Sequence, residues 1–132
     1  MTAIIRSCGK PETIRCLYRE TAQIGRIGIV GTGEAVTHLL FEVDTPPSAA
    51  EPGENPLLRE ASRQVAAYLE GRLRRFDLPL APGGTLFMHR VWERVLEVPY
   101  GATASYGQIA RAIGRPGAAR AVGMANGANP IP

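Results

Sequence analysis

The first half of the chain begins with apolar runs of strand length. Residues 24–30 and 35–41 are β-branched and apolar and flank a Gly-Thr-Gly turn, which predicts a β-hairpin. Residues 14–18 offer a further strand. Residues 44–56 hold four prolines and few apolar side chains, so we expect a loop there that separates structural units.

A helical period follows this loop. Four apolar residues recur at every fourth position: Leu57, Ala61, Val65 and Leu69. Asn55 can cap the start of this helix with Pro56 at its first position, and Gly71 can end it. We expect the helix to pack on the hairpin through its apolar side.

Residues 86–98 predict the first of three short helices in the second half of the chain. Pro99 ends this helix, and its apolar side holds Phe87, Val91, Trp92 and Val95. Ser105 followed three residues later by Gln108 is a capping box, so a second helix should begin at Tyr106. This helix is expected to bury Ile109, Ala110 and Ile113.

The last helix is expected over residues 118–126, which are rich in small side chains and precede Gly127. Together with residues 105–113 and the Gly/Pro turn between them, it has the dimensions of a helix-turn-helix. Its first half would present Arg120 as a long cationic side chain on a surface of small residues. Spacing alone leaves a purely structural helical hairpin as an equal alternative.

The charge distribution favours the DNA-binding alternative. Residues 1–85 hold ten basic and ten acidic side chains, so the net charge of +3 arises entirely after residue 85. Residues 98–132 contain three arginines and no Asp or Glu, the composition of a surface that meets phosphates. Fourteen of the fifteen basic residues are arginine, a bias that a GC-rich genome produces as well.

Length and cysteine usage exclude several classes. With 132 residues, 45% of them hydrophobic, the chain fits one small globular unit or two very small ones, not a collagen-like, coiled-coil or disordered protein. Because it has no apolar run of about 20 residues and no signal-peptide pattern, we expect a cytoplasmic protein. Cys8 and Cys16 predict neither a disulfide nor, with His38 and His89, a zinc site, so we expect no metal and no cofactor.

Three strings in residues 87–132 form a specific signature: VW followed by VPYG, then SYG, then RAVG followed by NP. They resemble the DNA-binding half of O6-alkylguanine-DNA alkyltransferases, the methylated-DNA–protein-cysteine methyltransferases. The hairpin, the helix at 55–71 and the string GRLRRFDLPLAPGGT resemble the N-terminal domain of bacterial members. The resemblance implies a ribonuclease-H-like α/β domain over residues 1–84. It implies a mostly helical, winged-helix-like helix-turn-helix domain over residues 85–132 that is incomplete.

The resemblance also implies that the helix-turn-helix docks in the minor groove of DNA and that the damaged guanine is flipped out. Arg120 matches the arginine that enters the base stack, and Tyr106 matches the tyrosine that crowds the adjacent phosphate and lines the base pocket. The other implied DNA-binding residues are Gly107 at the start of its helix, Arg115 near a phosphate, and the small residues Ala119 and Gly123 facing the DNA backbone.

The family reaction moves the alkyl group from guanine O6 to a cysteine thiolate. Asn129, which matches the asparagine that ties the recognition helix to the active-site turn, and Tyr106 are the supporting residues implied here. The family's Pro-Cys-His-Arg-Val motif is expected about five residues past Pro132, so we expect no acceptor cysteine within this chain. An ancillary zinc site is not expected, because Thr32 stands where zinc-binding members have a cysteine.

The leading hypothesis is therefore a monomeric DNA repair alkyltransferase whose partner is duplex DNA containing O6-alkylguanine. The chain as given should be inactive in alkyl transfer. The alternative is a non-enzymatic alkyltransferase-like protein that binds the lesion and hands it to another pathway. A regulator of undamaged promoters would need several base-reading side chains, and the last helix offers only Arg120 and Asn126.

Overall fold

The computed structural model describes residues 13–132 and divides them into two units. One comprises residues 13–82 and Pro130–Pro132, and the other comprises Gly83–Asn129. The domain boundary between residues 84 and 85 stays a prediction, and Cys8 lies outside the described residues. Within residues 13–132, every helix is too short or too polar to cross a membrane.

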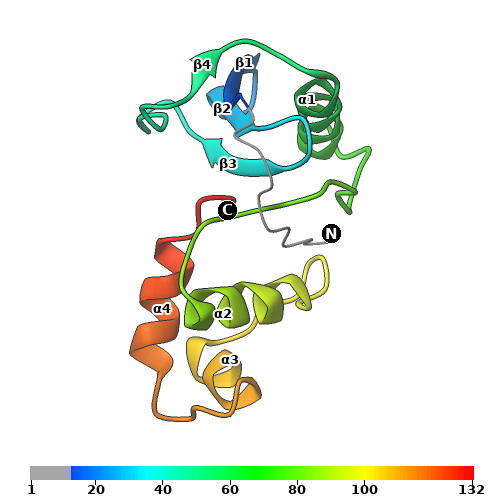
Figure 1. Ribbon diagram of the computed structural model, residues 1–132. Helices are drawn as coiled ribbons and strands as arrows, with labels where there is room; N and C mark the ends of the chain where they lie inside the picture. The colour runs from blue at the N-terminus through cyan, green and yellow to red at the C-terminus, as the bar shows by residue number, and fades with distance from the viewer. Residues whose placement is uncertain (1–12) are drawn as a thin grey trace. The chain divides into compact units, whose positions relative to one another are not determined.

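A four-stranded sheet forms the centre of the first unit (Figure 1). Strands β1 (Arg15–Thr21), β2 (Gly25–Gly31) and β3 (Val36–Leu40) are antiparallel neighbours, which confirms the expected hairpin and the strand before it. A short strand β4 (Glu51–Pro52) pairs in parallel with β1 inside the segment where we expected only a loop. Pro52 is tolerated there because β4 is an edge strand.

Both faces of the sheet are covered, as neighbouring residues on β2 show. Successive side chains of a strand point to opposite faces, yet Ile29 and Val30 are both buried. Ile29 packs with Leu58 in the core that includes helix α1 (Pro56–Leu69), whereas Val30 packs with Cys16 on the other face. Cys16 is therefore a small apolar core residue of the sheet.

Helix α1 (Pro56–Leu69) begins as expected, because the Asn55 side chain accepts a hydrogen bond from the Leu58 N–H at 2.8 Å. It packs on the strands of the hairpin. Its most buried apolar residue is Leu58, whereas Leu57, Val65 and Leu69, which we expected on the apolar side, are half-buried. A strict four-residue spacing drifts by about 40° per step around a helix, so such a series leaves the buried face.

The outer edge of β3 is covered by segments from distant parts of the chain. The Val36 N–H donates to the Pro79 carbonyl at 2.9 Å, and the Leu39 N–H donates to the Pro130 carbonyl at 2.8 Å. Ile131 packs against the core beneath α1. These bonds satisfy backbone groups that an open edge strand would expose.

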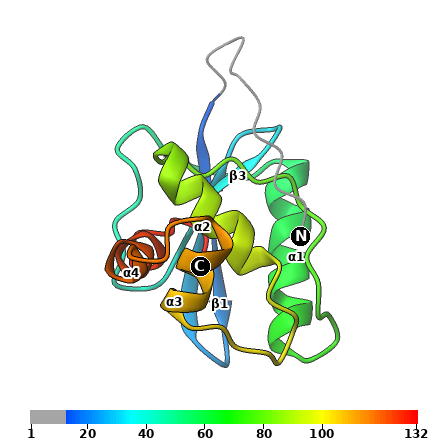
Figure 2. The ribbon, with the colours of Figure 1, turned by 90° about the horizontal axis from the view of Figure 1, so that it is seen from below.

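Three helices, packed against one another, form the second unit (Figures 1 and 2). They are α2 (Leu86–Leu96), α3 (Tyr106–Ala112) and α4 (Ala119–Gly127), close to their expected positions. Their shared core comprises Val91, Trp92, Ile109, Ala110, Val122 and Ala125. The Trp92 indole N–H donates to the Ala125 carbonyl at 2.8 Å in the interior, which ties α2 to α4.

Candidate nucleic-acid interface

The start of α3 is fixed by the expected capping box. The Gln108 N–H donates to Ser105 Oγ at 3.1 Å, and the Ser105 N–H donates to Gln108 Oε1 at 2.7 Å. These reciprocal bonds place Tyr106 at the first position of the helix, where its side chain is 49% exposed. About half of the surface of Tyr106 is thus open to solvent.

Helix α3 ends at a glycine in the left-handed backbone conformation, which begins the turn to α4. Gly114 has φ +77°, a conformation that glycine adopts at little cost. Its N–H donates to the Arg111 carbonyl at 3.0 Å, and the Arg115 N–H donates to the Ala110 carbonyl at 2.9 Å. The chain then starts α4 after Ala118, where no side chain caps the helix. The amino end of α4 is therefore left for other hydrogen-bond acceptors.

The exposed face of α4 carries two long side chains among small ones. Arg120 and Met124 lie one helical turn apart, and both are exposed, Met124 by 73%. Ala121 is also exposed on this helix, and the exposed Gly117 and Ala128 lie just before and just after it. Within residues 13–132 no carboxylate pairs with Arg120, so its guanidinium is available to an external acceptor.

Tyr106 and α4 meet at Gly123. A methyl group added to the Gly123 Cα would lie 2.9 Å from Tyr106 Cε2 and 3.1 Å from Cδ2, closer than carbon atoms pack. The Tyr106 ring therefore rests on the bare backbone of α4. Gly123 thus contacts Tyr106, and the expectation that it also faces the DNA backbone stays a prediction.

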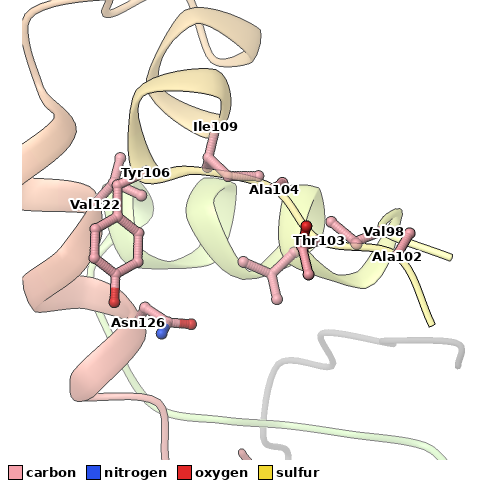
Figure 3. A pocket seen from close by; sticks show the side chains of 9 residues that line it. Val98, Ala102, Thr103, Ala104, Tyr106, Ile109, Val122 and Asn126 are labelled. Carbon is pink, nitrogen blue, oxygen red and sulfur yellow. The ribbon is translucent and has the colours of Figure 1, made fainter. Parts of the chain in front are cut away.

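Beside this contact lies a cavity of about 250 Å³ (Figure 3). It is lined by Val95, Val98, Ala102, Thr103, Ala104, Tyr106, Ile109, Val122 and Asn126. Figure 3 shows the Tyr106 ring alongside α4, with its hydroxyl group directed toward Asn126. The volume is close to the lower end of ligand pockets, about 300 Å³, and the lining is mostly apolar with a few polar groups, as in small-molecule sites.

Two further arginines follow Glu97, the last acidic residue of the chain. The Arg115 guanidinium lies 5.9 Å from the centre of the Phe87 ring. This contact orients the Arg115 side chain, and the residue stays exposed. Arg111 is exposed near the end of α3. Neither forms an ion pair with a carboxylate of the described residues.

The remaining expected site residues occupy different surroundings. Ala119 is half-buried at the first position of α4, and Gly107 is half-buried in the first turn of α3. Asn129 is half-buried just after α4, where its N–H donates to the Asn126 carbonyl at 3.3 Å. The structure thus brings Tyr106 and Gly123 into contact, and it places Arg115 in the turn before α4.

The resemblance implied a base pocket lined by Tyr106, but sequence reasoning missed the other residues that line the cavity, the exposed Met124 and the Tyr106–Gly123 contact. A weak signal for the contact was present, because glycine inside a helix is unfavourable by about 1 kcal/mol relative to alanine and often has a packing reason. No comparable signal marks the other lining residues, because they come from α2, the loop after it, α3 and α4.

The first unit contains Thr32 and His38, two of the residues that the sequence analysis considered for metal binding. Within the described part of the chain no three His, Cys, Asp or Glu side chains gather as metal ligands. Thr32 caps the hairpin turn, since its hydroxyl accepts from the N–H groups of Glu34 at 3.1 Å and Ala35 at 3.3 Å. His38 lies beside Thr37, and burial lowers the pKa of its imidazole.

Two protein-family models match the chain. The model described as the DNA binding domain of 6-O-methylguanine DNA methyltransferase matches residues 86–132, and the model of its ribonuclease-like domain matches residues 16–82. A methylated-DNA–protein-cysteine methyltransferase of Methanosarcina acetivorans is 46% identical over 113 residues, which cover 82% of this chain and 71% of the relative. The Mycobacterium tuberculosis protein of the same name is 46% identical over 110 residues, which cover 82% and 67%.

Solved structures agree with these matches. The structure of Mycobacterium tuberculosis OGT in complex with DNA is similar with a TM-score of 0.81 and 42% identity, covering 89% of this chain and 71% of that chain. The structure of the Mycobacterium tuberculosis O6-methylguanine methyltransferase gives a TM-score of 0.80 at 42% identity, covering 90% and 73%. Both units of the present chain fall within these similarities.

Proposed function

The chain belongs to the 6-O-methylguanine DNA methyltransferase family of DNA-binding repair enzymes, and on that premise we propose that it recognises O6-alkylguanine in duplex DNA by flipping the damaged base out of the stack. We propose further that it acts as a monomer in the cytoplasm, with DNA as its partner and without a cofactor.

The observation that carries this proposal is the state of Arg120. It projects from a face of α4 whose other side chains, apart from Met124, are small, and no carboxylate within residues 13–132 neutralises it. Small neighbours allow the helix to approach a duplex closely, and a long cationic side chain can then occupy the space that an extruded base leaves. Arg115 and the uncapped start of α4 supply phosphate contacts in this arrangement.

The cavity beside Tyr106 is the proposed receptor for the extruded base. Its apolar walls and the Tyr106 ring suit the faces of a purine, and Asn126 brings polar atoms to the same wall. Binding a flipped base in an apolar pocket offsets the unstacking free energy, which is a few kcal/mol and smallest for damaged bases. In this arrangement Tyr106, Gly107, Ala119 and Gly123 form the surface between pocket and duplex.

We propose that repair is stoichiometric. A cysteine sulfur forms a bond to the alkyl carbon as the bond between that carbon and guanine O6 breaks, which leaves a thioether on the protein and unmodified guanine in the DNA. Cys16 is buried in the sheet of the first unit, so we place the acceptor cysteine beyond Pro132, with Asn129 and Tyr106 as supporting residues. The alternative is a non-enzymatic protein that binds the lesion without alkyl transfer; in that protein another residue replaces the acceptor cysteine.

An intact-mass measurement separates these two functions. The natural gene product is incubated with a duplex that contains one O6-methylguanine, and its mass is recorded before and after. A gain of one methyl group supports alkyl transfer, whereas an unchanged mass with lesion-specific binding supports the non-enzymatic alternative. An unchanged mass without lesion preference would overturn both.

Substitution of Arg120 tests the recognition step. Arg120→Ala is expected to weaken binding to the O6-methylguanine duplex by about tenfold or more, in line with about 1–3 kcal/mol for a specific arginine contact. Two control substitutions remove the same charge elsewhere. Arg90→Ala removes it from α2, and Arg72→Ala removes it from the first unit, where the Arg72 guanidinium pairs with Glu70. Equal effects of all three substitutions would contradict the assignment.

A further inference from the structure

The contact between Tyr106 and Gly123 is closer than ordinary packing allows for any other residue at position 123. An added Cβ would lie 2.9 Å, 3.1 Å and 3.5 Å from three atoms of the Tyr106 ring, Cε2, Cδ2 and Cζ. Favourable contacts between carbon atoms begin at about 3.5 Å. Even alanine at position 123 would therefore require the ring to move.

The ring has little room to move while it still lines the cavity. The capping box between Ser105 and Gln108 fixes the backbone of Tyr106 at the first position of α3. Val122 and Asn126, which precede and follow Gly123 on α4, line the cavity together with the Tyr106 ring. A ring displaced from Gly123 has to rotate about its Cα–Cβ bond, which changes the wall of the cavity.

Gly127 provides the contrast on the same helix. A Cβ added to Gly127 would meet nothing within 4 Å, so glycine there serves no close approach. Both glycines lie in α4, where glycine is unfavourable by up to about 1 kcal/mol relative to alanine. Only Gly123 has a contact that explains why a helix-weakening residue stands at its position.

We infer that Gly123 is a positioning residue for base recognition, acting through Tyr106: it lets the tyrosine ring lie flat enough on α4 to form one wall of the cavity. The inference rests on the proposed function, in which this cavity receives the damaged base. It assigns Gly123 a role within the protein, distinct from the role of a small residue that merely clears space for the DNA backbone.

A double-mutant cycle tests the inference. The measured quantity is the ratio of dissociation constants for a guanine duplex and an O6-methylguanine duplex, for wild type, Gly123→Ala, Tyr106→Ala, the double variant and the control Gly127→Ala. Gly123→Ala is expected to lower this ratio by about fivefold or more, with no further loss when Tyr106 is already alanine, because residues that act through one contact are not additive. Gly127→Ala should keep the wild-type ratio.

Two results of the cycle overturn the inference. One is a loss from Gly123→Ala that is equally large in the Tyr106→Ala background, because Gly123 would then face the DNA directly. The other is a Gly123→Ala variant with the wild-type ratio. Thermal unfolding of each variant identifies any that fails to fold, and alanine at position 123 should not lower helix stability through propensity.

Nuclear magnetic resonance separates failure of this inference from failure of the proposed function. In the wild-type chain without DNA, nuclear Overhauser effects are expected between the Gly123 α-protons and the Tyr106 ring protons, and Gly123→Ala should shift the ring resonances while Gly127→Ala does not. Absence of these effects in the wild type overturns the inference. Their presence in a protein that shows no preference for the lesion would instead disprove the proposed function and confine Gly123 to packing.

Discussion

Arginine is used differently in the two units. In the first unit four arginines are paired with a glutamate near them in sequence: Arg26 with Glu20 at 2.7 Å, Arg59 with Glu54 at 3.0 Å, Arg63 with Glu60 at 2.5 Å, and Arg72 with Glu70. In the second unit only Arg94 has such a partner, Glu97, at 3.0 Å. Arg111, Arg115 and Arg120 come after the last carboxylate of the chain and stay exposed.

This difference arises from the position of the acidic residues rather than from the number of arginines. An exposed ion pair adds little stability, typically 0–1 kcal/mol, but it occupies the arginine. An arginine without a carboxylate neighbour retains its five N–H donors for a phosphate or a base. Substitutions that remove this difference between the units, or that measure its effect on DNA binding and stability, test the comparison.

Introducing a carboxylate beside Arg120 should produce the largest effect. Met124→Glu places the new charge one helical turn after Arg120, where it both pairs with the guanidinium and repels phosphates. We expect at least about tenfold weaker binding to O6-methylguanine duplex, measured by fluorescence anisotropy at fixed salt. The control Met124→Gln introduces a side chain of nearly the same shape as glutamate but without its charge. An equal loss of affinity in Met124→Gln would show that the charge is not the cause.

Removing an unpaired arginine away from the pocket should have a smaller effect that depends on salt. Arg115→Ala is expected to weaken binding to damaged and undamaged duplexes alike and to reduce the slope of log K against log salt by about 1. Arg63→Ala, which removes an arginine paired with Glu60, should leave that slope unchanged. Titrations between 50 and 200 mM salt measure both slopes, and the same change in both variants would remove the distinction between the units.

The smallest effect is expected for an ion pair of the first unit. The hydrogen bond from Arg63 lowers the pKa of the Glu60 carboxyl to about 2. A carboxyl whose pKa is lowered on folding stabilises the fold above its ordinary pKa of 4.5, and this contribution is lost as the pH falls through about 2. Glu60→Gln should therefore change thermal stability little at pH 7 and lessen its decline in acid; a large drop at pH 7 would show that the pair does more than lie in solvent.

The sequence predicted the parts of the fold that local chemistry determines. The Ser105–Gln108 capping box, the Asn55 cap and the hairpin depend on residues close together in the chain, and each was found. The segments that cover the edge of β3 could not be predicted, because Pro79 and Pro130 come from distant positions and no periodic pattern marks them. Contacts of this kind depend on tertiary packing rather than on local propensity.

The candidate site divides in the same way. The exposure of Arg120 followed from its place in a helix of small residues. The role of Gly123 did not, because it depends on a ring from α3 that packs against α4. The cavity likewise required the spatial arrangement of three helices and a loop.

The central claim is that α4 and the cavity beside it recognise a damaged guanine. The most direct test compares the affinity of the chain for two duplexes of the same sequence that differ only in one O6-methylguanine, by fluorescence anisotropy at 0.1 M salt. The account predicts tighter binding to the damaged duplex and loss of that preference in Arg120→Ala. Equal affinity of the wild-type chain for both duplexes would contradict it.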